Sequence, residues 1–437
     1  MGVNHVSLDR RDCLRLLAGA ALLSPLRGVS RASTAGVLAP SDEAWLDEMQ
    51  RRACLFFVEQ ASAATGQVQD RAENFNTSGK LDKRRMASIA ATGFGLTALC
   101  IADHRGYQPH DAVREQVRRT LRFHTNTLPH EHGFFFHFND IETGARYRDV
   151  ELSSIDTALL LCGVLAARAH FAGDAEIHEL ATTIYNRVDW PWMLNGGQTF
   201  SMGWKPESGF LKSRWNQYCE LMCLYLLAIG SPTHPIEPAR WDAWSRPVMK
   251  YDGFEYIGAA DPIFVHQYSH AWFDFRNKRD KYADYFANSI AATRAHRAFC
   301  LSLSKPYSAD YWGISASDSQ HGYTAWGGPS PTGGGFGGID GSVVPNATAG
   351  SLPFLPAECI HVQRALKEKY GKQAWGRYGF SDAFHPDVQW VDSDVLGIDL
   401  GISVLMAENL RTGFVWETFE RNPEVGLAMQ RAGFHKS

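Results

Sequence analysis

The sequence has little excess charge and no stretch rich in one sign, and this absence excludes one class of partner. Its 43 Lys and Arg residues nearly balance 47 Asp and Glu residues, leaving a formal net charge of -4. No stripe of Lys and Arg runs along the chain, so the electrostatic footprint of a nucleic-acid-binding protein is missing. A nucleic-acid partner is therefore not expected.

Paired cysteine motifs are also missing. The eight cysteines are scattered without a C-x-x-C pair, which argues against a disulfide scaffold and against a zinc site. Four histidines are too loosely spaced to form a metal site and are interpreted as structural: His266, His270, His296 and His321. The sequence therefore predicts no metal and no cofactor.

No hydrophobic run in the sequence is long enough for a stable membrane span, and this includes the short apolar run near the N-terminus. Residues 7–14 read SLDRRDCL and are followed by LLAGAALLSPL. Paired arginines before a short apolar run resemble a twin-arginine export signal, assigned to residues 1–35 with small residues near 30–32 for cleavage. An uncleaved N-terminal helix is the alternative. The prediction is a periplasmic monomer without stable membrane insertion.

Strand signals are few, whereas helical patterns are many. Apolar residues at three- and four-residue spacing predict helices at 42–62, 87–104, 110–125, 154–172, 175–188, 216–229, 280–303, 355–370, 395–410 and 423–432. The stretches 158–168, 221–229 and 395–407 are apolar nearly all round, which indicates helices enclosed by protein.

Two layers of helices, one enclosed and one amphipathic, with long loops at one end, predict an all-α fold, an α/α toroid, in one domain over residues 40–437. An α-solenoid is the alternative, although no repeat period is visible. The segments 134–139 and 145–150 flank IETG and predict one small β-hairpin. Three long loops rich in Gly, Pro and aromatic residues cover 190–210, 251–276 and 307–352, and loops of that length are usually functional or disordered.

Glu220 is the first candidate catalytic residue. It stands at the mouth of the uncharged run Leu221–Ile229, inside the predicted helix 216–229. Enclosure by apolar neighbours favours the protonated form of a carboxyl, and a neutral carboxylic acid can protonate a leaving group. The alternatives are a buried salt bridge, for example with Arg214, or a position facing a solvated groove.

Asp399 repeats this pattern within VLGIDLGISVLMAEN. Aspartate is a poor residue for a helix interior, because its side chain competes for nearby backbone groups. A capping or inter-helix hydrogen bond is the alternative, but Asp392 and Asp394 offer better caps. Asp399 is therefore a second candidate.

Glu151 and Asp156 stand at the start of another apolar helix, in VELSSIDTALLLCGVLAA. Ser153 and Asp156 also fit a capping box, which is the structural alternative for Asp156. In a toroid the inner helices begin around one opening, so all four carboxylates could converge there.

Aromatic loops with interleaved polar residues have the composition that an oligosaccharide cleft needs, although about half of these aromatics are expected only to pack the core. The candidate substrate-binding residues are Asp156, Trp204, Lys205, Tyr218, His270, Trp272, Asp274, Arg276, Asp318, Tyr323 and Trp326.

Several motifs, in order, resemble the bacterial glycoamylase-like family, which includes endo-β-1,2-glucanases and β-1,2-glucan exo-hydrolases. They are SMGWKPESGFL, YCELMCLYLLAIGSPTHP, HQYSHAWFDFRN, WGISASDSQHGYTAWGGP, DGSVVPNATAGSLPF, RYGFSDAFHP and DVLGIDLGISVLMAENLRTGFVW. The resemblance spans about residues 45–435.

This resemblance implies an (α/α)6 barrel and inverting hydrolysis of β-1,2-glucan without a cofactor. It makes Glu220 the general acid, Asp399 the base candidate and Glu151 a further carboxylate of the cleft. Inversion requires the two catalytic carboxyls about 6.5–9.5 Å apart, or farther if a second water relays the proton. Family members often have an aspartate where this chain has Arg148, with Asp149 beside it, which leaves endo or exo action open.

Two other functions remain open at the level of sequence. One is a different enzyme on the same architecture, either a retaining β-1,2-glucan transglycosylase or a polysaccharide lyase. The other is a non-catalytic periplasmic glycan-binding protein, for which Glu220 would be dispensable.

Overall fold

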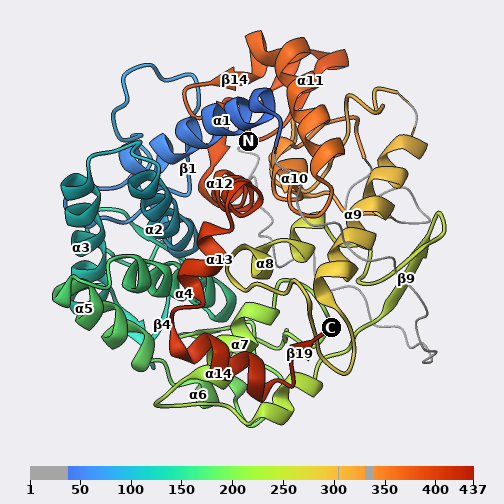
Figure 1. The fold of residues 1–437 in the computed structure, drawn as a ribbon. Coiled ribbons are helices and arrows are strands. Elements are labelled where there is room, and N and C mark those ends of the chain that lie inside the picture. Colours follow the sequence, from blue (N-terminus) through green and yellow to red (C-terminus); the bar gives the residue numbers. More distant parts are fainter. Residues whose placement is uncertain (1–37, 304, 330–338) are drawn as a thin grey trace, which may run out of the picture.

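The computed structural model describes residues 38–303, 305–329 and 339–437, and helices dominate this part of the chain (Figure 1). The helices are α1 (Pro40–Glu59), α2 (Ile89–His104), α3 (His110–Asn126), α4 (Ser154–His170), α5 (Ala175–Asn186), α6 (Trp190–Leu194), α7 (Met222–Gly230), α8 (Tyr268–Trp272), α9 (Tyr285–Ser302), α10 (Pro345–Ala349), α11 (Pro356–Ala374), α12 (Gly397–Arg411), α13 (Phe414–Phe419) and α14 (Pro423–Arg431).

An inner ring is formed by α2, α4, α7, α8, α10 and α12. Nearly every residue of these helices is buried, as expected for helices that are apolar all round. Helix α2 packs on α4 and α12, α4 packs on α7, and α12 packs on α8 and α10. The Cys223 N–H of α7 donates to Ser269 Oγ of α8, and Gln267 Nε2 donates to Ala347 O of α10. These contacts close the ring.

The outer helices alternate with the inner ones along the chain. Helix α5 packs on α4, α11 packs on α10, and α1 packs on α12 and α2, so the first described helix covers the last inner one (Figure 1). Helix α14 packs on α7 and takes the outer place beside it. A Cβ at Gly230 of α7 would lie 2.5 Å from Glu424 O, which shows how close these two helices are. The α/α-barrel fold predicted from the sequence is thus confirmed.

Neighbouring inner helices run parallel, with their N-termini at one end of the ring. Near the N-termini, Trp215 Nε1, in the segment before α7, donates to Ser154 Oγ of α4 at 2.8 Å. At the other end, His170 Nε2 of α4 lies 2.7 Å from Asp103 Oδ2 of α2. Between them, Gly93 of α2 faces Gly163 of α4, where a Cβ would meet Gly93 O at 2.0 Å.

Short strands surround the same end of the ring. Strands β2 (Met86–Ser88), β6 (Leu152–Ser153) and β18 (Asp394–Leu396) each end one residue before an inner helix begins. They pair with strands from the loops: β2 with β5 (Phe138–Asp140), β6 with β7 (Gly203–Lys205), and β18 with β1 (Arg71–Glu73). The remaining strands are β3 (His130–Glu131), β4 (Phe134–Phe135), β8 (Gly209–Phe210), β9 (Val248–Tyr251), β10 (Phe254–Ile257), β11 (Lys278–Arg279), β12 (Ala316–Ser317), β13 (Thr324–Ala325), β14 (Trp375–Gly376), β15 (Gly379–Phe380), β16 (Phe384–His385), β17 (Trp390–Val391) and β19 (His435–Lys436). This pairing ties the loops to the helix starts.

All ten predicted helices are present, but the sequence analysis missed α6, α8, α10 and α13. These helices have five or six residues, too few to show a helical period. The predicted hairpin exists in reduced form, because Tyr147 N donates to Phe138 O and Asp140 N donates to Ala145 O.

The predicted helix 216–229 begins later than expected, at Met222. Glu220 therefore precedes the helix, which corrects its predicted place inside a helix.

The predicted export signal at residues 1–35 lies outside the described residues and stays a prediction. Among the described helices, none combines the length and the apolarity that crossing a membrane requires.

The contact between α2 and α4 generates a test of the fold. We expect Gly163→Ala to destabilise the protein by about 1–3 kcal/mol, because the new methyl group would collide with the Gly93 backbone. Gly426→Ala in α14 is the matched control. Nothing lies within 4 Å of its added methyl group, so helix propensity should stabilise that variant by about 0.5–1 kcal/mol. Urea unfolding measures both; equal stability of the two variants would contradict the packing.

Candidate active site

Three carboxylates stand where inner helices begin. Glu151 precedes α4, Glu220 precedes α7, and Asp399 lies in the first turn of α12. All three side chains are buried, with 5–6% of their surface exposed. Because the N-termini of these helices share one end of the ring, the three carboxyls belong to the same end of the barrel.

Helix α8 connects Glu220 with Asp399. The Ser269 hydroxyl donates to Glu220 O at 2.8 Å, and the neighbouring Tyr268 hydroxyl lies 3.5 Å from Asp399 Oδ1. Two adjacent residues of one short helix therefore touch both segments. The structure thus places the predicted acid and the predicted base on either side of the start of α8.

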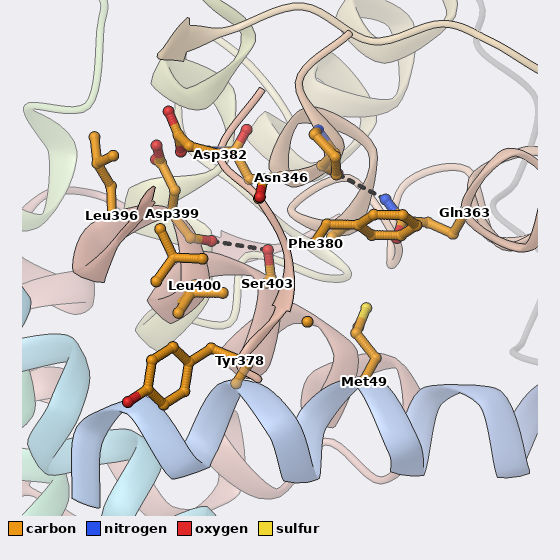
Figure 2. A pocket seen from close by; sticks show the side chains of 16 residues that line it. Met49, Asn346, Gln363, Tyr378, Phe380, Asp382, Leu396, Asp399, Leu400 and Ser403 are labelled. Atoms are coloured by element: carbon orange, nitrogen blue, oxygen red, sulfur yellow. Dashed lines mark hydrogen bonds between the residues drawn. The ribbon is translucent and has the colours of Figure 1, made fainter. Parts of the chain in front are cut away.

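Asp399 borders a small cavity, shown in Figure 2 between α1, α10, α11 and α12. Its backbone carbonyl accepts a hydrogen bond from Ser403 Oγ, one turn farther along α12. The carboxyl of Asp382 lies beside it, and the charge of Asp399 helps to raise the pKa of Asp382.

Glu220 has an acidic neighbour as well. Burial, together with the negative charge of Glu220, raises the pKa of Asp261 to about 7. Arg214, the salt-bridge partner suggested by the sequence, donates instead to the Leu194 carbonyl and the Thr199 hydroxyl. The acid candidate thus shares its surroundings with a second carboxyl.

His137 links Glu151 to Asp156. Its Nδ1 lies 3.3 Å from Glu151 Oε1, and its Nε2 lies 3.7 Å from Asp156 Oδ2. The Asp156 N–H also donates to Ser153 Oγ, and the two side chains are hydrogen-bonded, so the structural alternative for Asp156 is present. Asp156 is buried beside His137 in the first turn of α4, where Ser153 is the N-cap, and its role in substrate binding stays a prediction.

An ion-pair network borders Asp399 on the side of β1 and β18. Arg71 binds Asp70 and Asp318, and the Asp318 N–H donates to Asp382 Oδ2. Burial and the charge of Asp318 raise the pKa of Asp392 to about 7. Oxygens of Asp318, Asp382 and Asp392 lie within 4.8 Å of one another, the only grouping among the described residues with the spacing of a metal site.

This grouping has partners that do not involve a metal. Arg71 neutralises Asp318, and Asp392 Oδ1 accepts a hydrogen bond from the Asp394 N–H. A cluster of carboxyls that shares protons fits these contacts.

Four predicted substrate-binding residues lie at the inner-helix N-termini. Trp204 and Lys205 are half-buried on β7, whose Gly203 packs against the Glu151 side chain. Asp318 and Tyr323 come from the β12–β13 hairpin, which Asp318 joins to Asp382. These residues come from two of the long loops that the sequence predicted to be functional.

Four other predicted contacts have side chains buried in the core, and their role in substrate binding stays a prediction. They are Tyr218, His270, Trp272 and Trp326, all at most 4% exposed. Each side chain has a buried hydrogen-bond partner. The pairs are Tyr218 with His266, His270 with Ser289, Trp272 with Thr97, and Trp326 with Ser317. Aromatic and imidazole groups with buried polar partners are typical of a satisfied core.

Asp274 and Arg276 lie apart from the other candidates, and their role in substrate binding stays a prediction. They follow the C-terminal end of α8, away from Tyr268 and Ser269, and they pair with each other. The Arg276 guanidinium lies over the Trp416 ring at 4.0 Å. This pair belongs to the opposite end of the ring from the carboxylates.

The sequence analysis missed Arg71, His137, Asp261 and Asp382 as members of the site. Asp382 lies within the motif RYGFSDAFHP, which was noted without singling out this residue. The other three stand in segments without a visible period. Only tertiary contacts bring them to the inner-helix starts.

Comparisons with known proteins support the α/α-barrel fold described above. Residues 212–423 match the family model for glycoamylase, described as a putative glucoamylase. A putative glucoamylase from Bacteroides uniformis superposes with a TM-score of 0.83 at 27% identity, covering 91% of this chain and 99% of that one. The resemblance to the glycoamylase-like family is confirmed.

Two relatives have names that state an activity. The endo-β-1,2-glucanase from Chitinophaga pinensis, solved with sophorotriose and glucose, superposes with a TM-score of 0.83 at 25% identity, covering 91% of this chain and 99% of that one. An exo β-1,2-glucooligosaccharide sophorohydrolase from Parabacteroides distasonis is 26% identical over 90% of this chain. The chain spans 58% of the length of that relative.

The raised pKa of Asp261 generates a test of its burial beside Glu220. Its folded-state pKa of about 7 exceeds the ordinary value of 3.8, so its contribution to stability is complete at acid pH and is lost as the pH rises through about 7. Relative to Asp261→Asn, the wild type should therefore lose up to about 4 kcal/mol between about pH 4 and about pH 8.

Urea unfolding across this pH range measures the difference. The control is Asp252→Asn, because Asp252 is an exposed residue that precedes β10. A difference between the wild type and Asp261→Asn that does not vary with pH would show that Asp261 titrates normally.

Proposed function

We propose that this chain, glycoamylase-like over residues 212–423, is a glycoside hydrolase that cleaves β-1,2-glucan. The observation that supports it best is the placement of Glu220 and Asp399 on either side of the start of α8. Two carboxyls from different inner helices at one opening are what glycoside hydrolysis requires. The named activities of the two β-1,2-glucan-cleaving relatives supply the linkage.

In this proposal Glu220 is the general acid. It precedes an uncharged, buried helix, and low exposure favours a carboxyl that keeps its proton until the transition state. Glu220 would protonate the glycosidic oxygen as the bond to the anomeric carbon breaks. The loss of water around it strengthens this interaction.

Asp399 is the general base of the proposal. It would take a proton from a water that attacks the anomeric carbon from the opposite ring face, which inverts the configuration. Tyr268 orients its carboxyl, and the N-terminus of α12 favours its ionised form. Glu151, which pairs with His137, precedes α4, the inner helix beside α7, and is assigned to substrate hydroxyls.

A panel of glucans tests the substrate. We expect hydrolysis of linear β-1,2-glucan and no hydrolysis of β-1,3-glucan or starch, with products separated by size. Sophorose as the only product would show exo action, whereas a ladder of oligosaccharides would show endo action. Cleavage of starch would overturn the linkage, and the anomer of the first product, read by NMR, decides between inversion and retention.

Two amide variants test the catalytic pair. Glu220→Gln and Asp399→Asn should each lower kcat by about 10²–10⁴-fold, because each removes a proton-transfer group at nearly constant volume. Glu131→Gln is the control, since Glu131 is exposed on β3. A Glu220→Gln variant with the kcat of the wild type would exclude Glu220 as the acid.

A further inference from the structure

Asp382 is a buried acid for which the proposed reaction has no use. It follows β15, and its N–H donates to Asp394 O at 3.0 Å. One carboxyl oxygen, Oδ2, accepts the Asp318 N–H at 2.9 Å. Only 5% of the residue is exposed, so the second oxygen cannot rely on bulk solvent for a partner.

The second oxygen of Asp382 has Asp399 within reach. Figure 2 shows the two carboxyls side by side among the residues that line the cavity, and the charge of Asp399 helps to raise the pKa of Asp382. The cavity holds about 30 Å³ for water centres, room for one or two molecules. So small a volume does not solvate two negative charges.

The charged groups around Asp382 do not neutralise it. Asp399 faces it from α12, Asp318 from the β12–β13 hairpin, and Asp392 from the segment before β18. The cation of this cluster, Arg71, is already paired with Asp70 and Asp318. No ion pair joins Asp382 to a Lys or Arg within the described residues. Two carboxylates in contact under these conditions cannot both be ionised.

Geometry decides which of the two acids keeps the proton. Asp399 lies in the first turn of a 15-residue helix, where the unpaired N–H groups and the helix dipole favour a negative charge, and it has Tyr268 as a donor. Asp382 has one oxygen that accepts from a backbone N–H and one that faces Asp399. That is the arrangement of a neutral acid, with a carbonyl oxygen that accepts and a hydroxyl that donates.

We infer that Asp382 is a positioning residue, which holds a proton and donates it in a hydrogen bond to Asp399. This bond keeps Asp399 ionised and fixes its orientation while the reaction runs. The inference rests on the proposed function for the role of Asp399 as the base. The contact between the two carboxyls does not depend on that function.

Two variants of Asp382 test whether its side chain acts as a hydrogen-bond donor, as a negative charge or only as a group that fills space. Asp382→Asn retains an N–H donor toward Asp399, so its kcat should stay within about 5-fold of the wild type, with the acid limb of the kcat–pH profile near its original position. Asp382→Leu removes the donor, and kcat should fall by about 10²–10³-fold with little change in KM. Its acid limb should move to higher pH, because Asp399 would lose a bond that stabilises its charge.

Asp387→Asn is the matched control, because Asp387 is exposed on the same segment of chain. It should leave both kcat and its pH profile unchanged. A loss in Asp382→Asn as large as in Asp382→Leu would overturn the inference, since a negative charge rather than a donor would then be required. An acid limb that stays in place in Asp382→Leu would show a merely structural role.

Stability tests the carboxyl pair without any activity. Burial and the neighbouring Asp399 raise the pKa of Asp382, so its stabilising contribution is complete at acid pH and is lost as the pH rises. The wild type should thus lose stability relative to Asp382→Asn as the pH rises, by thermal unfolding. A difference that stays constant with pH overturns the pair. If no glucan is cleaved but this difference grows, the proposed function fails while the pair stands.

A cation is the rival occupant of this cluster. Thermal unfolding with Ca²⁺ or Mg²⁺ alone, against EDTA, decides between the two. The melting temperature should not respond to either ion. A clear rise with one ion in the wild type, absent in Asp382→Asn, would show that a metal rather than a proton neutralises these carboxyls and would overturn the inference.

Discussion

The parallel packing of the inner helices is the constraint on which the rest of the structure depends. Gly93 and Gly163 let α2 and α4 approach closely, and the remaining inner helices follow around the ring. Because the N-termini share one end, every residue that precedes an inner helix lies near the same opening. The short strands β2, β6 and β18 join the loops to these starts. The site is therefore a consequence of helix direction.

Buried carboxyls at such an opening are costly, and the structure offsets this cost with specific partners. His137 pairs with Glu151, and Arg71 pairs with Asp318. The first turn of α12 favours the negative charge of Asp399. Within the described part of the chain, no Lys or Arg forms an ion pair with Asp261 or Asp382, and burial beside another acid raises the pKa of each. Glu220 and Asp399 thus each have an acidic neighbour. Proton distribution among neighbouring acids is the chemistry that a glycoside hydrolase needs.

Composition did not separate residues near the inner-helix N-termini from residues of the core. Aromatic residues that carry a polar group suit a sugar-binding cleft and a core with satisfied hydrogen bonds equally well, so composition cannot separate the two environments. Trp272 and Tyr218 found buried partners in Thr97 and His266, whereas Trp204 on β7 remained half-buried. Position along the helix decided the outcome: residues toward the C-terminal end of α8, from His270 to Arg276, lie away from the opening.

The sequence by itself determined the all-α class, the ten longer helices and the two candidate acids, because apolar periodicity and isolated charges are local properties. It also carried the motifs of the glycoamylase-like resemblance. Only the tertiary structure decided that α8 and α10 are inner helices, since five residues show no period. Contacts such as those of Asp382 with Asp399 and of Asp261 with Glu220 join segments far apart in the chain, and no local pattern encodes their distance or their shared loss of solvent.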